Sequence, residues 1–323
     1  MPMPIRQPRF IQLHRADSHA ERAAAVSALT AEPAGASPKY FYDKLGSHLF
    51  DAITELPEYY PTRTEAALFA AHGAEMASLI GAGSTFVDLG AGNCAKAAKL
   101  LPLLDPARYV AVDISADYLH DALRQLQREH PALDMIGVGM DFSASPLLPA
   151  DVLNVGARPV FFYPGSSIGN FAPAHAARFL EGIRAQAGGG GLLIGVDLIK
   201  DAALLQAAYD DAIGVTAAFN LNLLRHLNRT IGSDFEPRDW QHVALFNAAE
   251  SRIEMHVEAR HAVEVRWPGG ARRFAPGERI HTENSYKYSV ASFGELLAGA
   301  GFGNTRCWTA PGDAFAVFWA EAG

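Results

Sequence analysis

Ten consecutive residues, Val87 to Lys96 with the sequence VDLGAGNCAK, limit the folds open to this chain more than any other stretch. An apolar run ends in an acidic residue, two glycines follow, and the helix-forming run AKAAKLL comes next. In parallel α/β sheets this order places backbone N–H groups at the carboxyl end of a strand, where they face an anionic or zwitterionic ligand. The stretch therefore predicts a ligand-binding loop, and the alternative is a tight strand-to-helix turn that binds nothing.

The spacing of the glycines narrows the class of ligand. Gly90 and Gly92 form only a G-x-G pattern, because the third glycine of the dinucleotide fingerprint is absent. Both glycines allow a ligand to approach the backbone closely. A pyrophosphate fits such a loop less well than a smaller nucleoside does, so we expect S-adenosylmethionine rather than NAD as the cofactor.

Acidic residues also end the next two apolar runs. Asp113 follows residues 109–112, about twenty positions after the glycine loop, where a carboxylate can accept hydrogen bonds from both ribose hydroxyls. The alternative role of Asp113 is to cap the following helix. Asp141 and Phe142 follow residues 135–140 and suit an adenine, because a carboxylate can bind its amino group and an aromatic ring can stack on it.

Composition and charge exclude several other classes of function. The chain has 323 residues, of which 49% are hydrophobic, enough for a large core in one or two domains. Its net charge of −8 argues against nucleic acid as a partner, since phosphate binding needs a basic face. We recognise no signal peptide, no membrane-length apolar run, and no disulfide framework in its two cysteines. We expect a cytoplasmic monomer that acts on a small molecule, with neither nucleic acid nor membrane as a partner.

Strand and helix patterns alternate from Glu65 to Leu198, as in a doubly wound parallel sheet. The fourth strand, residues 159–163, leads into the loop PGSSIGNF, which contains Gly165 and Asn170. Loops at the carboxyl ends of such strands carry the chemistry of these folds, so the Asn170 amide and the loop carbonyls can meet a substrate there. The alternative for Asn170 is a simple cap of the next helix.

The pattern changes after Lys200. A long helical region comes first, and runs that alternate apolar and polar residues follow, as expected for antiparallel strands. The helical region is 202–227, and the strands are 253–259, 262–267 and 277–288. The chain closes with two runs, residues 304–309 and 315–320, joined by the turn at residues 311–313. They predict a hairpin at the edge of the first sheet, as in class I methyltransferases.

Together these patterns predict an α/β fold with two domains. A doubly wound, Rossmann-like sheet forms the methyltransferase core from residues 61–198 and 288–323. A smaller α+β domain, from residues 1–60 and 199–287, forms the substrate-binding part.

Aromatic residues are concentrated between positions 39 and 65. Tyrosine combines an apolar face with a hydroxyl, so Tyr42, Tyr59 and Tyr60 can wall a pocket for a small amine, or they can lie in a core with their hydroxyls bonded elsewhere. No H-E-x-x-H, paired C-x-x-C or P-loop motif occurs, and the 12 histidines lack ligand spacing. We therefore expect no metal.

Several of these segments together resemble the L-histidine Nα-methyltransferase family of ergothioneine biosynthesis. The likeness covers nearly the whole chain. It rests on YFYD at 40–43 with Gly46-Ser47 and Leu49-Phe50 after it, LPEYYPTRTE at 56–65, the 165–171 loop, and the segment from YDD at 209–211 through Asn220. That family uses S-adenosylmethionine three times to convert histidine to hercynine, on a methyltransferase core with a second, substrate-binding domain. The resemblance implies the same reaction, cofactor and architecture for this chain.

The resemblance also implies roles for individual residues. The implied histidine contacts are Tyr59, Asn170, Tyr209, Glu283 and Ser285, together with the loop at Gly165. The implied cofactor contacts are Gly90, Lys96, Asp113, Asp141 and Phe142.

Glu283 and Ser285 suit the recognition of an imidazole ring. The carboxylate can accept a hydrogen bond from one ring nitrogen and the hydroxyl can meet the other, while Asn284 between them faces the opposite way. Alternatively, both are exposed polar residues on a strand. The attacking amine has to be neutral, which desolvation and an acceptor such as the Asn170 oxygen favour. Asn170 and Tyr42 are the candidate catalytic residues.

Two other functions remain open. One is a related enzyme of the same family that methylates another amine or an aromatic amino-acid derivative. An indole or a phenol would form fewer hydrogen bonds with such a site than an imidazole, so Glu283 distinguishes the two. The other is a module that binds S-adenosylmethionine without catalysis, although a full set of pocket residues in one chain argues against it.

Overall fold

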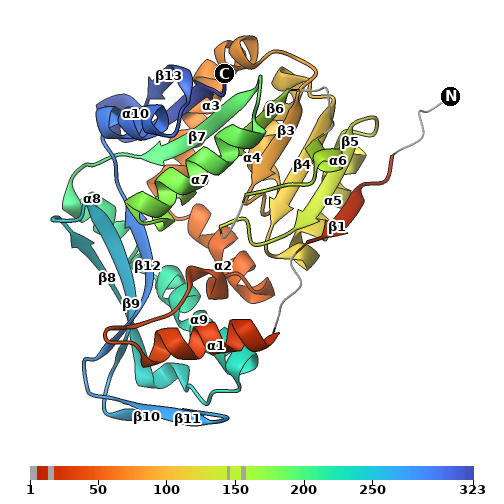
Figure 1. Cartoon of the computed structure of the whole chain (residues 1–323). Coiled ribbons are helices and arrows are strands. Elements are labelled where there is room, and N and C mark those ends of the chain that lie inside the picture. The colour runs from red at the N-terminus through yellow and green to blue at the C-terminus, as the bar shows by residue number, and fades with distance from the viewer. Residues whose placement is uncertain (1–5, 14–17, 144–145, 154–157) are drawn as a thin grey trace. The chain divides into compact units, whose positions relative to one another are not determined.

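The structure, a computed structural model, describes residues 6–13, 18–143, 146–153 and 158–323. Within these residues the chain forms two compact units, each with its own hydrophobic core (Figure 1). The large unit comprises residues 6–13, Pro61–Ile199 and Lys287–Gly323. The small unit comprises residues 18–60 and Lys200–Tyr286.

An eight-stranded mixed sheet forms the centre of the large unit as far as it is described. The strand order is β1-β5-β4-β3-β6-β7-β14-β13, in which the first six are parallel and β14 is antiparallel to both of its neighbours. The strands are β1 (Arg9–Gln12), β3 (Thr85–Leu89), β4 (Arg108–Asp113), β5 (Asp134–Gly139), β6 (Pro159–Tyr163), β7 (Gly191–Asp197), β13 (Gly303–Thr309) and β14 (Phe315–Glu321). This sheet, with its edge hairpin, confirms the predicted doubly wound α/β fold.

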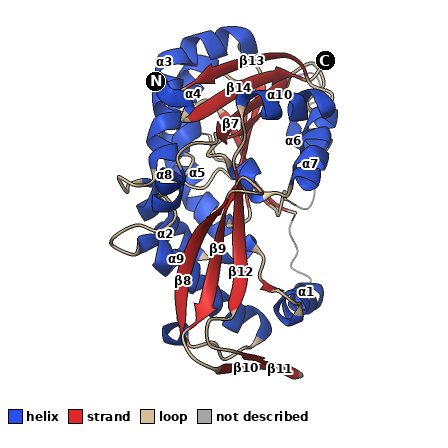
Figure 2. Ribbon diagram, turned by 90° about the vertical axis from the view of Figure 1, so that its left-hand side faces the viewer, coloured by secondary structure: helices blue, strands red, loops and turns tan. Residues whose placement is uncertain are grey.

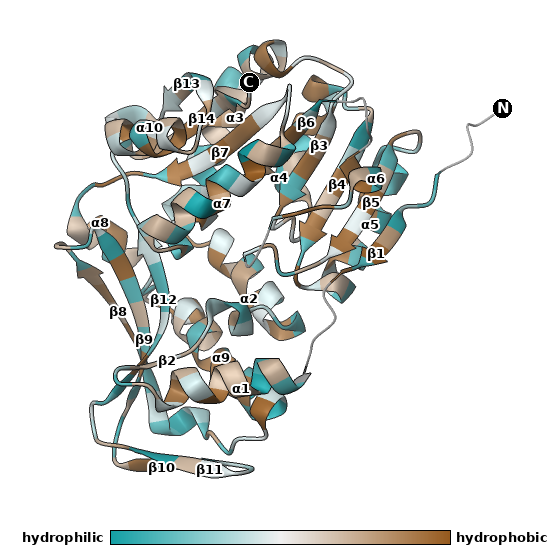
Figure 3. Ribbon diagram, viewed as in Figure 1, coloured by the Kyte–Doolittle hydropathy of each residue, from teal (hydrophilic) through white to brown (hydrophobic). Residues whose placement is uncertain are grey.

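The central strands are apolar because they are buried along their whole length. PVFFY in β6 and LLIGV within β7 are continuous apolar runs, and TFVDL in β3 is interrupted only by Asp88, as expected for parallel strands that crossover helices cover. In Figure 3, hydrophobic and hydrophilic bands alternate along one such helix, α7. The helical elements are α3 (Tyr60–Ile80), α4 (Ala95–Leu104), α5 (Ala116–Glu129), α6 (Ala150–Leu153), η2 (Ser167–Asn170), α7 (Pro173–Gln186), α10 (Val290–Gly299) and η4 (Pro311–Asp313).

The order of the strands shows where this sheet suits a ligand. The chain runs outward from β3 through β4 to β5 and then returns to β6, on the other side of β3. In open α/β sheets, ligands bind at this reversal point, beyond the carboxyl ends of the strands. The glycine loop follows β3 and the Gly165 loop follows β6, so both predicted loops flank the reversal point.

The N-terminal strand corrects the predicted domain boundary. The prediction assigns residues 1–60 to the second domain, but β1 pairs in parallel with β5, so residues 6–13 belong to the large unit. Glycine in β5 makes this pairing possible: a Cβ on Gly137 would lie 2.5 Å from the ring of Phe10. Four residues of strand were too few to show a period in the sequence.

A four-stranded sheet and a separate two-stranded hairpin occur among the described residues of the small unit. The sheet has the order β2-β12-β9-β8, and Figure 2 shows β8, β9 and β12 side by side. The strands are β2 (Ala34–Gly35), β8 (Trp240–Asn247), β9 (Arg252–Ala259), β10 (Val263–Trp267), β11 (Gly270–Phe274) and β12 (Arg279–Tyr286). Of these, β2, β8 and β11 were not predicted.

Helices complete the small unit. They are α1 (Ser18–Thr30), η1 (Pro38–Phe41), α2 (Lys44–Thr54), α8 (Ala202–Ala207), α9 (Val215–Ile231) and η3 (Pro237–Asp239). The single helical region predicted for 202–227 is therefore wrong. It is two helices, and Gly214, in the left-handed region at φ 81°, begins the second.

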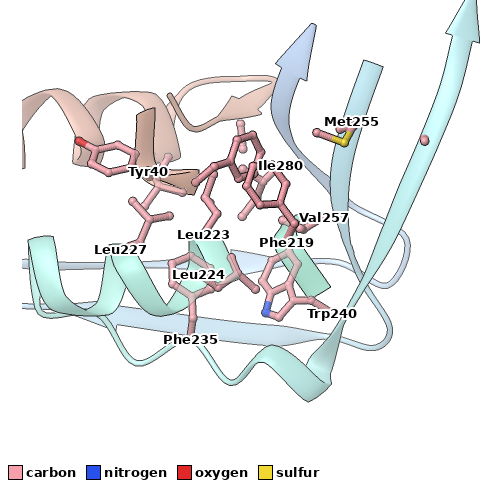
Figure 4. Packing of buried hydrophobic residues seen from close by; sticks show 14 of the residues in the cluster. Tyr40, Phe219, Leu223, Leu224, Leu227, Phe235, Trp240, Met255, Val257 and Ile280 are labelled. Carbon is pink, nitrogen blue, oxygen red and sulfur yellow. The ribbon is translucent and has the colours of Figure 1, made fainter. Parts of the chain in front are cut away.

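The core of the small unit lies between α9 and the sheet. Phe219, Leu223 and Leu227 recur at the spacing of one helix face and are buried. They belong to a single buried cluster that includes Val257 of β9 and Ile280 of β12 (Figure 4). This packing fixes α9 against the strands that carry the candidate substrate residues.

No helix in the described parts of the chain is long and apolar enough to cross a membrane.

Candidate active site

The glycine loop is a tight turn between β3 and α4. Gly90 and Gly92 both adopt left-handed backbone conformations, with φ of 74° and 52°. The Gly90 N–H donates to the carbonyl of Val112 at 2.8 Å, which fixes the loop to the neighbouring strand. A Cβ on Gly92 would have no atom within 4 Å, so the backbone is open on that side. The loop therefore leaves room for a ligand to touch the main chain.

Asp113 is bound to this loop. One carboxylate oxygen accepts the Gly92 N–H at 2.9 Å, and the other accepts the Ser115 N–H at 2.8 Å at the start of α5. The alternative that Asp113 caps α5 is wrong, since the residue before the first turn of α5 is Ser115 and no side chain caps the helix there. Because each carboxylate oxygen can accept more than one hydrogen bond, the bonds to Gly92 and Ser115 do not prevent contact with a ligand.

Phe142 lies over the glycine loop, after β5. A Cβ on Gly90 would be 3.5 Å from the Phe142 ring, and that ring packs edge-on against Tyr163 at 5.9 Å between centroids. The neighbouring Asp141 accepts the Ser143 N–H at 3.1 Å. The structure therefore brings Gly90 and Phe142 together. Asp113 belongs to the same group because it accepts a hydrogen bond from Gly92 of the same loop.

Lys96 and Gly165 meet through a residue that the sequence analysis did not single out. Glu65 of α3 is fully buried, and its carboxylate accepts from Lys96 Nζ at 2.7 Å and from the Gly165 N–H at 2.8 Å. A Cβ on Gly195 in β7 would lie 1.9 Å from a Glu65 oxygen, so only glycine fits beneath it. A glycine inside an apolar strand was the available signal, because it marks a close approach.

Asn170 ends η2 in the loop after β6. The alternative that it caps α7 is wrong, since the residue before the first turn of α7 is Ala172 and no side chain caps the helix there. At the start of the same loop, the Ser166 hydroxyl accepts the Asp197 N–H at 2.8 Å. The loop is therefore tied to β7 as well as to Glu65.

A buried ion pair lies at the end of β7. Lys287 Nζ is 2.8 Å from the Asp197 carboxylate, and both side chains are almost completely buried. Sequence reasoning missed this pair, because the two residues lie ninety positions apart and neither belongs to a motif.

In the small unit, three predicted substrate residues come together. The Tyr209 hydroxyl donates to the Ser285 hydroxyl at 2.7 Å, and the Tyr59 and Tyr209 rings meet edge-on at 6.4 Å. Glu283 lies two residues from Ser285 on β12. Glu283 and Ser285 are only 7% and 3% exposed, so the alternative that they are solvated strand residues is wrong.

The strand register confirms that Asn284 faces away from its neighbours. Glu283 pairs with Met255 and Ser285 pairs with Ile253, both of which are core residues, whereas Asn284 pairs with Glu254. Directly opposite residues share one face of an antiparallel sheet. Glu283 and Ser285 therefore lie on the core face.

Tyr42 lies in the same unit, at the end of η1. Its ring packs edge-on against Phe50 at 5.9 Å and Phe219 at 5.7 Å. Phe50 in turn contacts Tyr59 at 6.2 Å, which connects Tyr42 to the substrate residues through one aromatic ring.

Among the described residues, no group of three His, Cys, Asp or Glu side chains could hold a metal ion.

Comparison with known proteins assigns the family. Residues 21–322 match the family model for the histidine-specific methyltransferase, SAM-dependent. The chain is 42% identical to the histidine N-alpha-methyltransferase of Mycolicibacterium smegmatis, over 94% of this chain and 95% of that protein. It is 41% identical to the enzyme of the same name from Mycobacterium tuberculosis, over 88% and 89% of the two chains.

A longer fungal protein is also related. The ergothioneine biosynthesis protein 1 of Neurospora crassa is 33% identical over 83% of this chain, which spans 31% of that protein. With a family match from residue 21 to residue 322 and more than 40% identity to two full-length relatives, this chain belongs to the histidine-specific, S-adenosylmethionine-dependent methyltransferases.

Proposed function

We propose that this protein transfers three methyl groups from S-adenosylmethionine to the α-amino group of L-histidine and so forms hercynine, the first step of ergothioneine biosynthesis. The observation that carries the proposal is the group formed by the buried Glu283 and Ser285 and the half-buried Tyr209. A buried carboxylate beside two hydroxyls suits a ring with two nitrogens, and it disfavours side chains that leave it unpaired. In this proposal the small unit is the substrate-binding domain and the large unit is the methyltransferase core.

The residues of the large unit fit S-adenosylmethionine. The open backbone at Gly92 admits a ligand, Asp113 keeps acceptor capacity for the ribose hydroxyls, and Phe142 offers an aromatic face beside the loop. Gly90, Asp141 and Lys96 complete the proposed cofactor contacts. The bound cofactor supplies an electrophilic methyl group on a sulfonium.

The chain's own residues are proposed to align the amine and to favour its neutral form. Methyl transfer is an in-line displacement, so holding the amine close to the sulfonium supplies much of the rate. The carbonyls of the Gly165 loop and the Asn170 side-chain oxygen accept hydrogen bonds from the amine and so orient its lone pair, while desolvation favours the neutral amine over the ammonium. Tyr59 and Tyr42 wall the amine, and Glu283 and Ser285 hold the imidazole.

We further propose that the protein acts in the cytoplasm as a monomer, with neither nucleic acid nor membrane as a partner. The interspersed charges and the net charge of −8 support the part of this proposal that concerns nucleic acid.

One assay tests the function. The protein is incubated with S-adenosylmethionine and each proteinogenic amino acid in turn, and the products are followed by mass spectrometry. We expect histidine alone to gain one, two and three methyl groups. Methylation of another amine with histidine unchanged would favour a different enzyme of the same family, and no methylation at all would favour a binding module.

A further inference from the structure

Asn220 of α9 lies at the centre of a hydrogen-bond network in the small unit. Its side chain is completely buried. The amide nitrogen lies 2.9 Å from the carbonyl oxygen of His256 and 2.7 Å from Nδ1 of His242, and the amide oxygen lies 2.8 Å from the Thr282 hydroxyl. A carbonyl can only accept, so the contact with His256 identifies the amide nitrogen and fixes the orientation of the side chain.

The first branch of the network reaches Tyr209. His242 Nε2 lies 2.8 Å from the backbone carbonyl of Tyr209, so Nε2 carries the proton and donates. His242 Nδ1 is then the acceptor for Asn220, which requires a neutral imidazole. Asn220 thereby orients the histidine that holds the main chain of Tyr209.

The second branch reaches β12 at an irregularity of the sheet. The β12 register against β9 shifts between His281 and Glu283, which leaves Thr282 as the extra residue of a β-bulge. Ile280 faces the core before the bulge. Strict alternation would turn Glu283 to the opposite face, and the extra residue returns Glu283 and Ser285 to the core face. The hydroxyl of Thr282 lies 2.8 Å from Asn220 Oδ1 and 2.9 Å from the Met255 carbonyl.

We propose that Asn220 is a positioning residue for imidazole recognition, acting on Tyr209 through His242 and on Glu283 and Ser285 through the Thr282 bulge. The three recognition groups come from two segments about seventy-five residues apart, and Asn220 bonds to the supports of both. This inference rests on the proposed function, because it assumes that these groups bind histidine.

The charges around His242 agree with a neutral ring. Burial lowers the pKa of His242, while the Tyr209 carbonyl and the carboxylates of Asp210 and Asp211 raise it by less. Asp210 and Asp211 follow α8, and the group that faces the ring from α9 is the Asn220 amide. Protonation of Nδ1 would put two donors against each other and break the contact between His242 and Asn220.

A pair of substitutions tests the bulge. Thr282→Val keeps the shape but removes the hydroxyl, and we expect the histidine KM to rise roughly tenfold while kcat changes little, because the bound substrate is misplaced. Thr282→Ser keeps the hydroxyl and should stay near wild type. The affinity for S-adenosylmethionine, measured by calorimetry, should be unchanged in both.

A second control separates positioning from stability. Asn228 is on the same helix and also makes three hydrogen bonds, to Ser233 and to the backbone of Phe235. Asn228→Ala and Asn220→Ala should both lower the melting temperature, but only Asn220→Ala should raise the histidine KM. Equal effects of the two substitutions on KM would overturn the proposal.

The pH profile of Asn220→Asp provides the sharpest test. A carboxylate at this position would accept from Nδ1 of a protonated His242, so the network would persist at low pH and break as pH rises. We expect the ratio of the histidine KM of Asn220→Asp to that of wild type to fall toward acid pH. Because histidine itself titrates, variant and wild type are compared at each pH.

The outcomes separate the two proposals. If wild-type protein does not methylate histidine, the proposed function fails. If it does, but Thr282→Val and Asn220→Asp leave the histidine KM and its pH profile unchanged, only the role of Asn220 fails.

Discussion

In the large unit, the proposed cofactor residues are held mainly by backbone groups of the turns that follow the strands, whereas in the small unit the proposed histidine residues are held by side chains from distant segments. Asp113 accepts from the main chain of Gly92 and Ser115. Tyr209 and Ser285, in contrast, bond to each other across 76 positions of sequence. The first arrangement requires particular residue types at fixed offsets, and the second requires a packed domain.

The comparison teaches that the two groups of residues should respond differently to substitution. A change in a strand-to-helix turn should act on cofactor affinity, because the turn is itself the binding surface. A change in the small unit should act on the histidine KM, either directly or through a supporting side chain.

The largest expected effect is that of Asp113→Ala on cofactor binding. Losing two charge-assisted hydrogen bonds to ribose should weaken S-adenosylmethionine binding by roughly a hundredfold or more, since each is worth about 1.5–3 kcal/mol. Calorimetric titration measures this change. Asp117→Ala, an exposed position in the first turn of the same helix, is the control and should bind normally. An unchanged affinity in Asp113→Ala would limit that residue to its contacts with the main chain of Gly92 and Ser115.

Glu283→Ala should come next and should act on the other substrate. Removing one charge-assisted hydrogen bond to the imidazole should raise the histidine KM by roughly ten- to a hundredfold, with cofactor affinity unchanged. Steady-state kinetics measure both values. Asn284→Ala, on the opposite face of β12, should leave the histidine KM within about twofold. If Glu283→Ala keeps wild-type histidine kinetics, the physical basis for histidine recognition is lost.

A related substitution sharpens specificity. We expect Glu283→Met to methylate tryptophan faster than the wild-type protein does, because no buried carboxylate is left unpaired against an indole. Kinetics with histidine and tryptophan on both proteins test this expectation, which fails if tryptophan stays inert.

Gly195→Ala tests how tightly the large unit is fitted. The new methyl group would lie 1.9 Å from Glu65, which would have to leave Lys96 and Gly165. Overpacking of this kind costs about 1–3 kcal/mol in the free energy of unfolding, measurable with denaturant. Gly294→Ala, where a Cβ would meet nothing within 4 Å, is the control. Combining Gly195→Ala with Glu65→Ala should recover part of the loss, and a purely additive result would contradict the clash.

The smallest expected effect is a difference in pH dependence between the units. Burial lowers the pKa of His256 to about 4, below its ordinary 6.5, so the unfolded chain binds more protons in that window and the small unit loses stability as pH falls through it. Burial raises the pKa of Asp88 from 3.8 to about 7, so the large unit loses stability as pH rises through that range.

Amide hydrogen exchange on the whole chain can resolve this difference, after correction for the intrinsic pH dependence of exchange. Protection of β9 should increase with pH, and protection of β3 should decrease. His256→Gln and Asp88→Asn should each flatten the response of its own unit. Parallel trends in both strands, unaffected by these substitutions, would contradict the assignment of the two groups.

Much of the large unit could be predicted because its signals are local. The runs that became β3, β6 and β7 are mainly apolar, and the glycines and acids that follow them have fixed positions. β1 was not predicted, because it is short and its position in the sheet depends on pairing with β5, where the Phe10 ring packs against Gly137.

The amino-acid sequence by itself determined the strand-to-helix turns, the α/β class and the residue types offered to a nucleoside, since backbone conformation at Gly90 and Gly92 depends on neighbours along the chain. Only the tertiary structure decided that Glu283 and Ser285 face the core. A single extra residue at Thr282 reverses the alternation of a strand, and the hydrogen bond from Thr282 to Asn220 crosses 62 positions of sequence. Long-range contacts of this kind leave no periodic trace in the sequence, because each depends on a partner that only folding brings near.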